Sequence, residues 1–226
     1  MAITVRSETT GATSGSVGDV VTVSKPATIV NGDTLVVIMG AGDDQPSIAA
    51  PAGWTEGDRS GSAVGNDRQI GIFYKYIPDT TAEPANYTFT VGSGDNVAWW
   101  IGALTDVDTT SPQDEPMSGN SVLVSNTATP TAPQITTATT NAFVLAGWAT
   151  NFDNSQTMPG GNWATRANNI VSGVLIAINV ASQTFATPGL TGDVALANGT
   201  STAETQCGQW AFRETKNRML NICANG

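Results

Sequence analysis

A repeated segment constrains the fold of this chain more than any other feature. The first copy, NGDTLVVIMGAGDDQPSIAAPAGW, runs from Asn31 to Trp54, and the second, NAFVLAGWATNFDNSQTMPGGNW, runs from Asn141 to Trp163. Val36 and Val144 lie 108 residues apart (144 − 36), and Trp54 and Trp163 lie 109 apart (163 − 54). Each copy is an apolar run too short for a helix, bounded by turn residues, which predicts a buried strand followed by a shaped loop. The chain is therefore predicted to contain two similar β-rich halves.

Other segments extend this pattern into a full set of strands. Asp67–Ile77 and Asn86–Val91 alternate with a period of two, and Asn96–Leu104 is apolar on both faces, as in a central strand. Further strands are expected at residues 3–7, 19–24, 33–40, 142–149, 170–181, 193–197 and 205–213. Ser7–Asp19 reads as a polar linker, and Thr105–Asn120 as the joint between the halves.

The strand pattern predicts an all-β fold. Short strands with long turns favour an antiparallel, jelly-roll-like β-sandwich of about eight to ten strands. We expect a single domain over residues 1–226, with repeats at 17–108 and 121–213 and a C-terminal extension at 214–226. The extension could dock, fray or reach a neighbouring molecule, and two tandem domains are the alternative to one fused core.

Composition narrows the classes of partner. The net charge is −10 and no cluster of Lys and Arg offsets it, so binding to nucleic acid is not expected. No apolar run is long enough to span a membrane, and no Sec signal peptide is visible at the N-terminus. We expect synthesis in a cytoplasm, where Cys207 and Cys223 would be free thiols although a disulfide between them is the alternative.

The chain lacks the residues on which most catalysis depends. It contains no histidine, no P-loop, no G-x-G-x-x-G motif and no CxxC pair. We therefore assign no catalytic, cofactor-binding or metal-binding residues, and we expect a protein that is not an enzyme and needs no cofactor. A pair of carboxylates of the glycosidase type is the remaining catalytic alternative. The acidic candidates, all in expected loops, are Asp43, Asp44, Asp106, Asp108, Asp114 and Glu115.

The first two of these acidic pairs each have two interpretations. Asp43 and Asp44 could contribute to a Ca²⁺ site, because hard cations need several oxygen ligands, but adjacent loop acids are more often solvated. Asp106 and Asp108 could ligate a cation in the same way. We favour the view that they accept hydrogen bonds from turn amides in the joint.

The six tryptophans suggest either a sugar-binding surface or a packed core. Trp54 and Trp163 occupy equivalent positions after a turn, which favours a structural plug that packs each loop onto the sandwich. Trp99, Trp100 and Trp210 lie in apolar strands, so we expect them in the core. Trp99 and Trp100 must point to opposite faces of their strand, and we expect Trp210 to match one of them.

Five segments together resemble a β-sandwich module of bacteriophage virion proteins and some bacterial surface proteins. They are GDTLVVIM, APAGW, IGIFYKYI, EPANYTFT and AWWIGALTDVD. The similarity covers about residues 17–108, and residues 128–213 more faintly through the internal repeat. It implies a structural or adhesive part, such as a capsid decoration (cement) protein or a component of a head or tail fibre.

The leading hypothesis from this resemblance is a capsid decoration protein on the outer surface of the phage head. Its expected partners are the major capsid protein and copies of itself, as a homotrimer in one arrangement that suits local three-fold positions. A glycan-binding module of a fibre or surface protein is the second hypothesis and requires an exposed tryptophan. A carbohydrate-active enzyme is the third, and it requires two carboxylates facing a cleft.

Overall fold

The computed structural model describes residues 2–13, 20–42, 48–60, 68–92, 96–150, 156–169, 176–197 and 202–215. Over these ranges the fold is all-β, every strand pairing is antiparallel, and a single 3₁₀ turn, η1 (Thr80–Ala82), is the one helical element. Predictions about Asp43, Asp44, Cys223 and residues 216–226 lie outside the described residues. No helix in the described part of the chain has the length and apolar character needed to cross a membrane.

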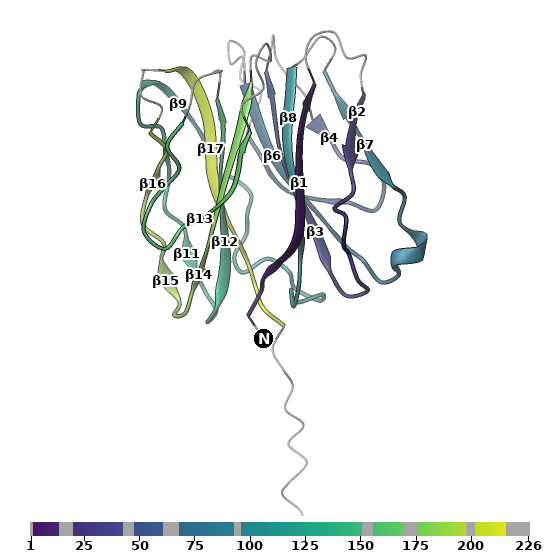
Figure 1. The fold of residues 1–226 in the computed structure, drawn as a ribbon. Helices are drawn as coiled ribbons and strands as arrows, with labels where there is room; N and C mark the ends of the chain where they lie inside the picture. Colours follow the sequence, from purple (N-terminus) through teal and green to yellow (C-terminus); the bar gives the residue numbers. More distant parts are fainter. Residues whose placement is uncertain are drawn as a thin grey trace, which may run out of the picture.

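Two five-stranded sheets form the middle of the molecule (Figure 1). The first has the order β1 (Val5–Thr13), β8 (Asn96–Leu104), β3 (Thr34–Gly42), β6 (Arg68–Tyr76) and β5 (Thr55–Arg59). The second has the order β9 (Ser121–Thr127), β17 (Thr202–Phe212), β12 (Ala142–Thr150), β14 (Ala177–Phe185) and β13 (Ala164–Asn169). The two sheets pack face to face around a shared inner core, so the predicted antiparallel β-sandwich is confirmed.

Each five-stranded sheet also carries an outer layer on the face that points away from the inner core (Figure 1). In the first half this layer is a three-stranded sheet of β2 (Val20–Ser24), β7 (Asn86–Val91) and β4 (Ile48–Ala49). In the second half it consists of two short ribbons, β10 (Thr131–Ala132) with β16 (Val194–Ala195) and β11 (Thr136–Thr137) with β15 (Gly189–Leu190). Strands β1 to β4 alternate between the inner and outer sheets of the first half; a jelly-roll connectivity stays a prediction.

The inner core is assembled from large side chains of both sheets and from glycines that make room for them. Ile38 and Trp100 of the first half meet Trp210 and Phe212 of the second in one buried cluster. At the centre β3 faces β12 so closely that a Cβ on Gly40 would lie 2.7 Å from the Cβ of Ala149. Two residues away, a Cβ on Gly147 would lie 3.2 Å from a methyl carbon of Ile38.

Strand register shows how the two halves correspond. The bulge in β5 lies between Glu56 and Asp58, and the bulge in β13 lies 109 residues later (165 − 56), between Thr165 and Ala167. Val36 faces the inner core, whereas Val144 lies between the inward-facing Phe143 and Leu145 and so points outward. An offset of 109 for β3 and β12, rather than the 108 read from these two valines, therefore keeps equivalent side chains on the same face.

The same register corrects the expected match of Trp210. In the sheets, Val36 pairs with Gly102 and Leu145 pairs with Trp210, so Trp210 corresponds to Gly102 rather than to Trp99 or Trp100. Both strands thus carry one inward tryptophan and one inward glycine two residues apart, in opposite order. A Cβ on Gly102 would lie 2.5 Å from the Trp100 ring, and a Cβ on Gly208 would lie 2.9 Å from the Trp210 ring.

Two of the expected boundaries were wrong. The first strand continues to Thr13 instead of giving way to a linker at Ser7, because its β-branched and small residues pair along the whole edge of β8. In the second half, the strand expected at 170–181 begins at Ala177 and continues to Phe185. Residues 170–175 lie outside the described part of the chain. Asn96–Leu104 is paired on both sides, as expected for a central strand.

Candidate functional site

The joint between the halves carries most of the acidic candidates, and it is firmly held. Asp108 accepts hydrogen bonds from the backbone N–H groups of Thr110 (2.8 Å) and Ser111 (3.0 Å), which confirms its predicted role as a cap of turn amides. Asp106 adopts a left-handed backbone conformation, with φ of 56°. Its carbonyl accepts a hydrogen bond from the Thr215 N–H, which docks the first residues of the C-terminal extension onto the joint.

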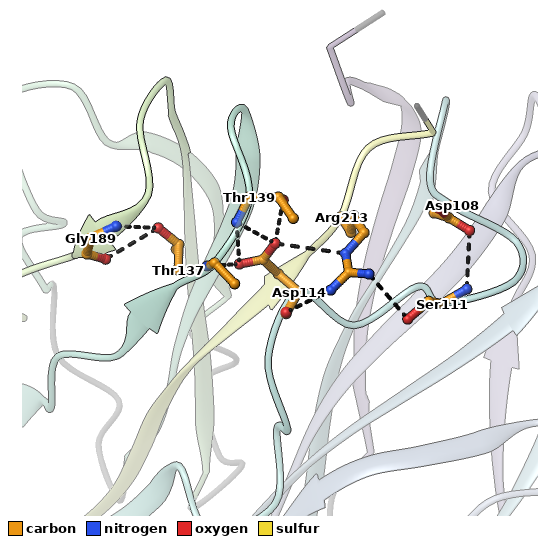
Figure 2. A network of polar contacts seen from close by, with 8 residues as sticks. Asp108, Ser111, Asp114, Thr137, Thr139, Gly189 and Arg213 are labelled. Carbon is orange, nitrogen blue, oxygen red and sulfur yellow. Dashed lines mark hydrogen bonds and ion pairs between the residues drawn. The ribbon is translucent and has the colours of Figure 1, made fainter. Parts of the chain in front are cut away.

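Asp114 is the centre of a buried network that ties the joint to the second half (Figure 2). Its carboxylate accepts hydrogen bonds from the N–H groups of Ala138 (2.5 Å) and Thr139 (3.1 Å) and from the Thr139 hydroxyl. The Nε of Arg213 lies 4.0 Å from the same carboxylate, and another guanidinium N–H donates to the Asp114 carbonyl at 3.1 Å. The neighbouring Glu115 is exposed. Asp114 therefore has a structural role, and its carboxylate has little hydrogen-bonding capacity left for a ligand.

Asp58 is a second buried carboxylate that holds distant segments together, and the sequence analysis did not identify this role. It lies at the bulge of β5 and accepts from the N–H groups of Gly119 and Ser121, both at 2.9 Å. The indole N–H of Trp210 donates to the same carboxylate at 3.0 Å. Residues 55–59 are not among the strands expected from the sequence, and a single acid in a polar segment does not indicate a buried partner.

The described residues contain no cluster of three or more Cys, Asp or Glu side chains that could hold a metal ion. Cys207 is a free, buried thiol whose Sγ lies 3.3 Å from the Thr131 carbonyl, and burial raises its pKa to about 12. A thiol that stays protonated is a poor nucleophile. Cys207 therefore belongs with Asp58 and Asp114 among the buried groups that hold the fold.

The tryptophans lie where the sequence placed them. Trp100 and Trp210 are in the inner core, and Trp99 faces the outer core of the first half, so the adjacent pair points to opposite faces as predicted. Trp54 and Trp163 are half-buried and pack on the outer faces of their own halves. The structural interpretation of these five residues is confirmed.

Trp54 illustrates how closely such a plug is packed. Its ring meets Tyr87 at 5.0 Å and Phe89 at 5.5 Å, both edge to face. Below it, the Tyr87 hydroxyl donates to Glu83, which also accepts from Lys75 at 2.8 Å. Burial and the contact with Glu83 raise the pKa of Tyr87, so this hydroxyl remains a donor at every physiological pH.

Two adjoining hollows open beside the joint, near the end of β6. The first, of about 350 Å³, is lined by Thr34, Gly53, Thr55, Tyr74, Lys75, Tyr76, Asp108, Thr109 and Pro112. The second, of about 470 Å³, is lined by Thr4, Arg6, Val30, Asn31, Gly32, Asp33, Thr105, Asp106, Val107, Thr109 and Thr215. Thr109 lines both, so the two hollows lie on either side of one turn.

We compared the chain with protein-family models, with curated proteins and with solved structures. None of the three comparisons found a match. The function must therefore be argued from the chain itself.

The structure places the two acids of the predicted Asp106 and Asp108 pair in different hollows. Asp106 lines one hollow and Asp108 lines the other, while Thr109 lines both. Asp108 is the one carboxylate of its hollow. In the second hollow, Asp33 is buried and paired with Arg6 at 2.9 Å. This arrangement favours binding of a polar ligand over carboxylate-pair catalysis, which needs two acids on opposite sides of one bond.

Proposed function

We propose that this protein is a non-enzymatic structural component of a bacteriophage virion. In this proposal it is a capsid decoration protein that binds the major capsid protein on the outer surface of the head and stabilises it. Synthesis takes place in the host cytoplasm, and binding needs neither nucleic acid nor a membrane. The starting point is the resemblance of residues 17–108 to the virion β-sandwich module.

The segments that carry the resemblance belong to one packed body, which supports the proposal. GDTLVVIM contains most of β3, IGIFYKYI most of β6, and AWWIGALTDVD the end of β8. APAGW supplies the Trp54 plug, and EPANYTFT supplies the β7 residues on which that plug rests. The resemblance therefore rests on residues that fix a fold and not on scattered surface positions.

One observation carries the non-enzymatic part of the proposal: buried groups that could do chemistry serve the architecture instead. Asp33 accepts from Arg6 and from the Val30 N–H. Asp58 and Asp114 each hold several N–H groups, as described above. Carboxylates saturated by N–H donors have little free capacity to act as a base or to bind a ligand.

The surface fits a protein that binds to a large assembly. The edge strands β1 and β9 each have one side without a strand partner in the described sheets, and such backbone edges can pair with another chain. Leu123 of β9 is exposed, which adds an apolar contact to this edge. We propose that β9 contacts the capsid or a second copy of the protein, with a homotrimer as the expected assembly.

The test is binding to capsids from which accessory proteins have been stripped. The purified protein should co-sediment with these capsids at a fixed, saturable ratio when added at about 1 µM. Leu123→Lys should weaken binding, because it places a charge on the proposed contact edge. Leu190→Lys, at the exposed ribbon β15, is the matched control and should bind normally. Failure of the unmodified protein to co-sediment would refute the proposal.

A further inference from the structure

We propose that the two hollows beside the joint form a binding site for a neutral oligosaccharide. This proposal is independent of capsid binding and names a ligand class for a surface that the virion role does not use. It rests on three features of the hollows: an exposed aromatic ring, a set of hydroxyl and carboxylate groups, and the local balance of charge.

Tyr76 supplies the aromatic surface. It is the last residue of β6, is 42% exposed, and lines the first hollow. Tyr76 thus presents its ring to solvent, whereas Tyr74, two residues earlier on the same strand, packs against Phe212 and accepts a hydrogen bond from Gln113. A pyranose ring has an apolar C–H face that packs on such an aromatic ring, while its hydroxyls remain free to bond elsewhere.

The polar lining provides partners for those hydroxyls. Thr34, Thr55 and Thr109 line the first hollow, and a hydroxyl can both donate and accept. Both turn amides capped by Asp108 bond to its Oδ1 atom, which leaves Oδ2 as an acceptor for a ligand hydroxyl. A volume of about 350 Å³ lies at the small end of ligand sites, and the second hollow shares the lining residue Thr109 with the first. This favours a chain of sugars over a single one.

Charge selects a neutral ligand. The basic groups at the two hollows are already paired, Arg6 with Asp33 and Lys75 with Glu83. Within the described ranges no ion pair involves Asp106 or Asp108, so their negative charges would repel a uronic acid or a sulfated sugar. The net charge of −10 acts in the same direction.

The experiment is calorimetric titration of the full chain with a panel of neutral hexasaccharides built from glucose, mannose, galactose or xylose. Oligogalacturonate of the same length is the anionic comparison. At least one neutral probe should bind with a Kd of about 1 mM or tighter, and oligogalacturonate should bind at least about tenfold more weakly.

Three variants locate the site. Tyr76→Ala should weaken binding of the neutral probe at least about tenfold, and Asp108→Asn, which keeps the turn cap, should weaken it about threefold or more. Leu190→Ala, which removes an apolar side chain 64% exposed on the other half, should leave the affinity unchanged. The proposal is wrong if no neutral probe binds, or if binding is the same in Tyr76→Ala as in the unmodified protein. Tyr76→Ala should still co-sediment with stripped capsids. A protein that binds capsids but no sugar would refute this proposal and leave the proposed virion role intact.

Discussion

Trp54 and Trp163 occupy matching places in the two halves but have different surroundings. Trp54 meets two aromatic rings, with centroids 5.0 and 5.5 Å away, whereas Trp163 meets Phe185 at 6.2 Å. In the described residues, the outer core beneath Trp54 is the larger of the two, whereas the one beneath Trp163 consists of Trp148 and Leu196 with several small side chains. Equivalent residues therefore need not contribute equally to stability.

This difference predicts unequal costs of truncation. Trp54→Ala should lower the free energy of unfolding by about 3 kcal/mol, because it removes two ring contacts and exposes part of the outer core. Trp163→Ala is the matched variant, and its cost should be smaller by about 1 kcal/mol or more. Chemical denaturation of both variants measures the difference. Equal costs would show that the aromatic pairs of Trp54 contribute little.

Cys207 makes the stability of the protein depend on pH at the alkaline end. Burial raises the pKa of its thiol from the ordinary 9.0 to about 12. Between pH 9 and pH 12 the folded state therefore holds a proton that the unfolded chain releases. The free energy of unfolding is unaffected by this thiol below pH 9 and falls as pH rises toward 12. The loss should amount to about 1.4 kcal/mol per pH unit within that window.

The check compares the free energy of unfolding of Cys223→Ser with that of Cys207→Ala/Cys223→Ser at pH 8 and at pH 10.5. Raising the pH from 8 to 10.5 should lower the free energy of unfolding more for the protein that retains Cys207 than for the protein that lacks it. In the same Cys223→Ser protein, a thiol reagent should modify Cys207 at pH 8 only after unfolding. Rapid modification of the folded protein would contradict the burial argument.

At the scale of the strand, β8 and β17 each place one tryptophan and one glycine, two residues apart, in the inner core. Trp100 lies over Gly102 in β8, and Trp210 lies over Gly208 in β17. The indole ring occupies the space that a side chain on the glycine would need, so a change at either residue affects the other. Only the order along the strand differs between the halves.

Adding a methyl group to such a glycine should be costly. Gly102→Ala places a Cβ 2.5 Å from the Trp100 ring and should destabilise the protein by about 1–3 kcal/mol. Gly160→Ala is the matched control, since no atom lies within 4 Å of its added Cβ, and it should change stability by less than about 0.5 kcal/mol. The double variant Trp100→Phe/Gly102→Ala should cost less than the sum of its parts when measured by denaturation.

The strand elements that could be predicted from the sequence are those with strong periodicity. β3, β6, β7, β8 and β12 lie close to their expected ranges. β1 was cut short because an edge strand with alternating polar and small residues resembles a linker until its partner is known. The offset between the halves was wrong by one residue at Val144, because buried strands are apolar on both faces and their pattern does not reveal which face is inward.

For the molecule as a whole, buried contacts between distant segments decide whether the halves act separately. Asp58 of the first half binds the indole of Trp210 in the second, and Asp114 of the joint binds the segment before β12. These contacts join residues 152 and 24 positions apart. Neither could be predicted from the sequence, because a lone acid gives no sign of a partner so far along the chain.

The two halves should therefore unfold together. Hydrogen exchange read by mass spectrometry should give peptides from β3 and β8 the same opening free energy as peptides from β12 and β17. Asp58→Asn should lower both values by a similar amount, about 1–3 kcal/mol, because it leaves a buried donor without its acceptor. Two separate opening free energies would instead describe two tandem domains.

The candidate site shows a similar limit of sequence reasoning. Asp106 and Asp108 were recognised as a pair, and one cap of turn amides was predicted correctly. The hollows also need Tyr76 from β6 and Thr34 from β3, which only the folded sheet brings to the same turn. The exposure of Tyr76 carried no signal either, since Tyr76 continues the apolar alternation of Ile70, Ile72 and Tyr74 along its own strand.

The facing pairs Gly40 with Ala149 and Ile38 with Gly147 have a consequence for the ancestry of the chain. With the offset of 109, each pair consists of two equivalent positions, so they lie on the axis of approximate two-fold symmetry (149 − 40 and 147 − 38). In a dimer of identical subunits, such a position meets its own copy, and two alanines or two isoleucines would collide there. A gene that encodes both halves in one polypeptide escapes this restriction and can set a larger residue against a glycine. Joined halves could thus diverge at their common axis in a way that an ancestral homodimer could not.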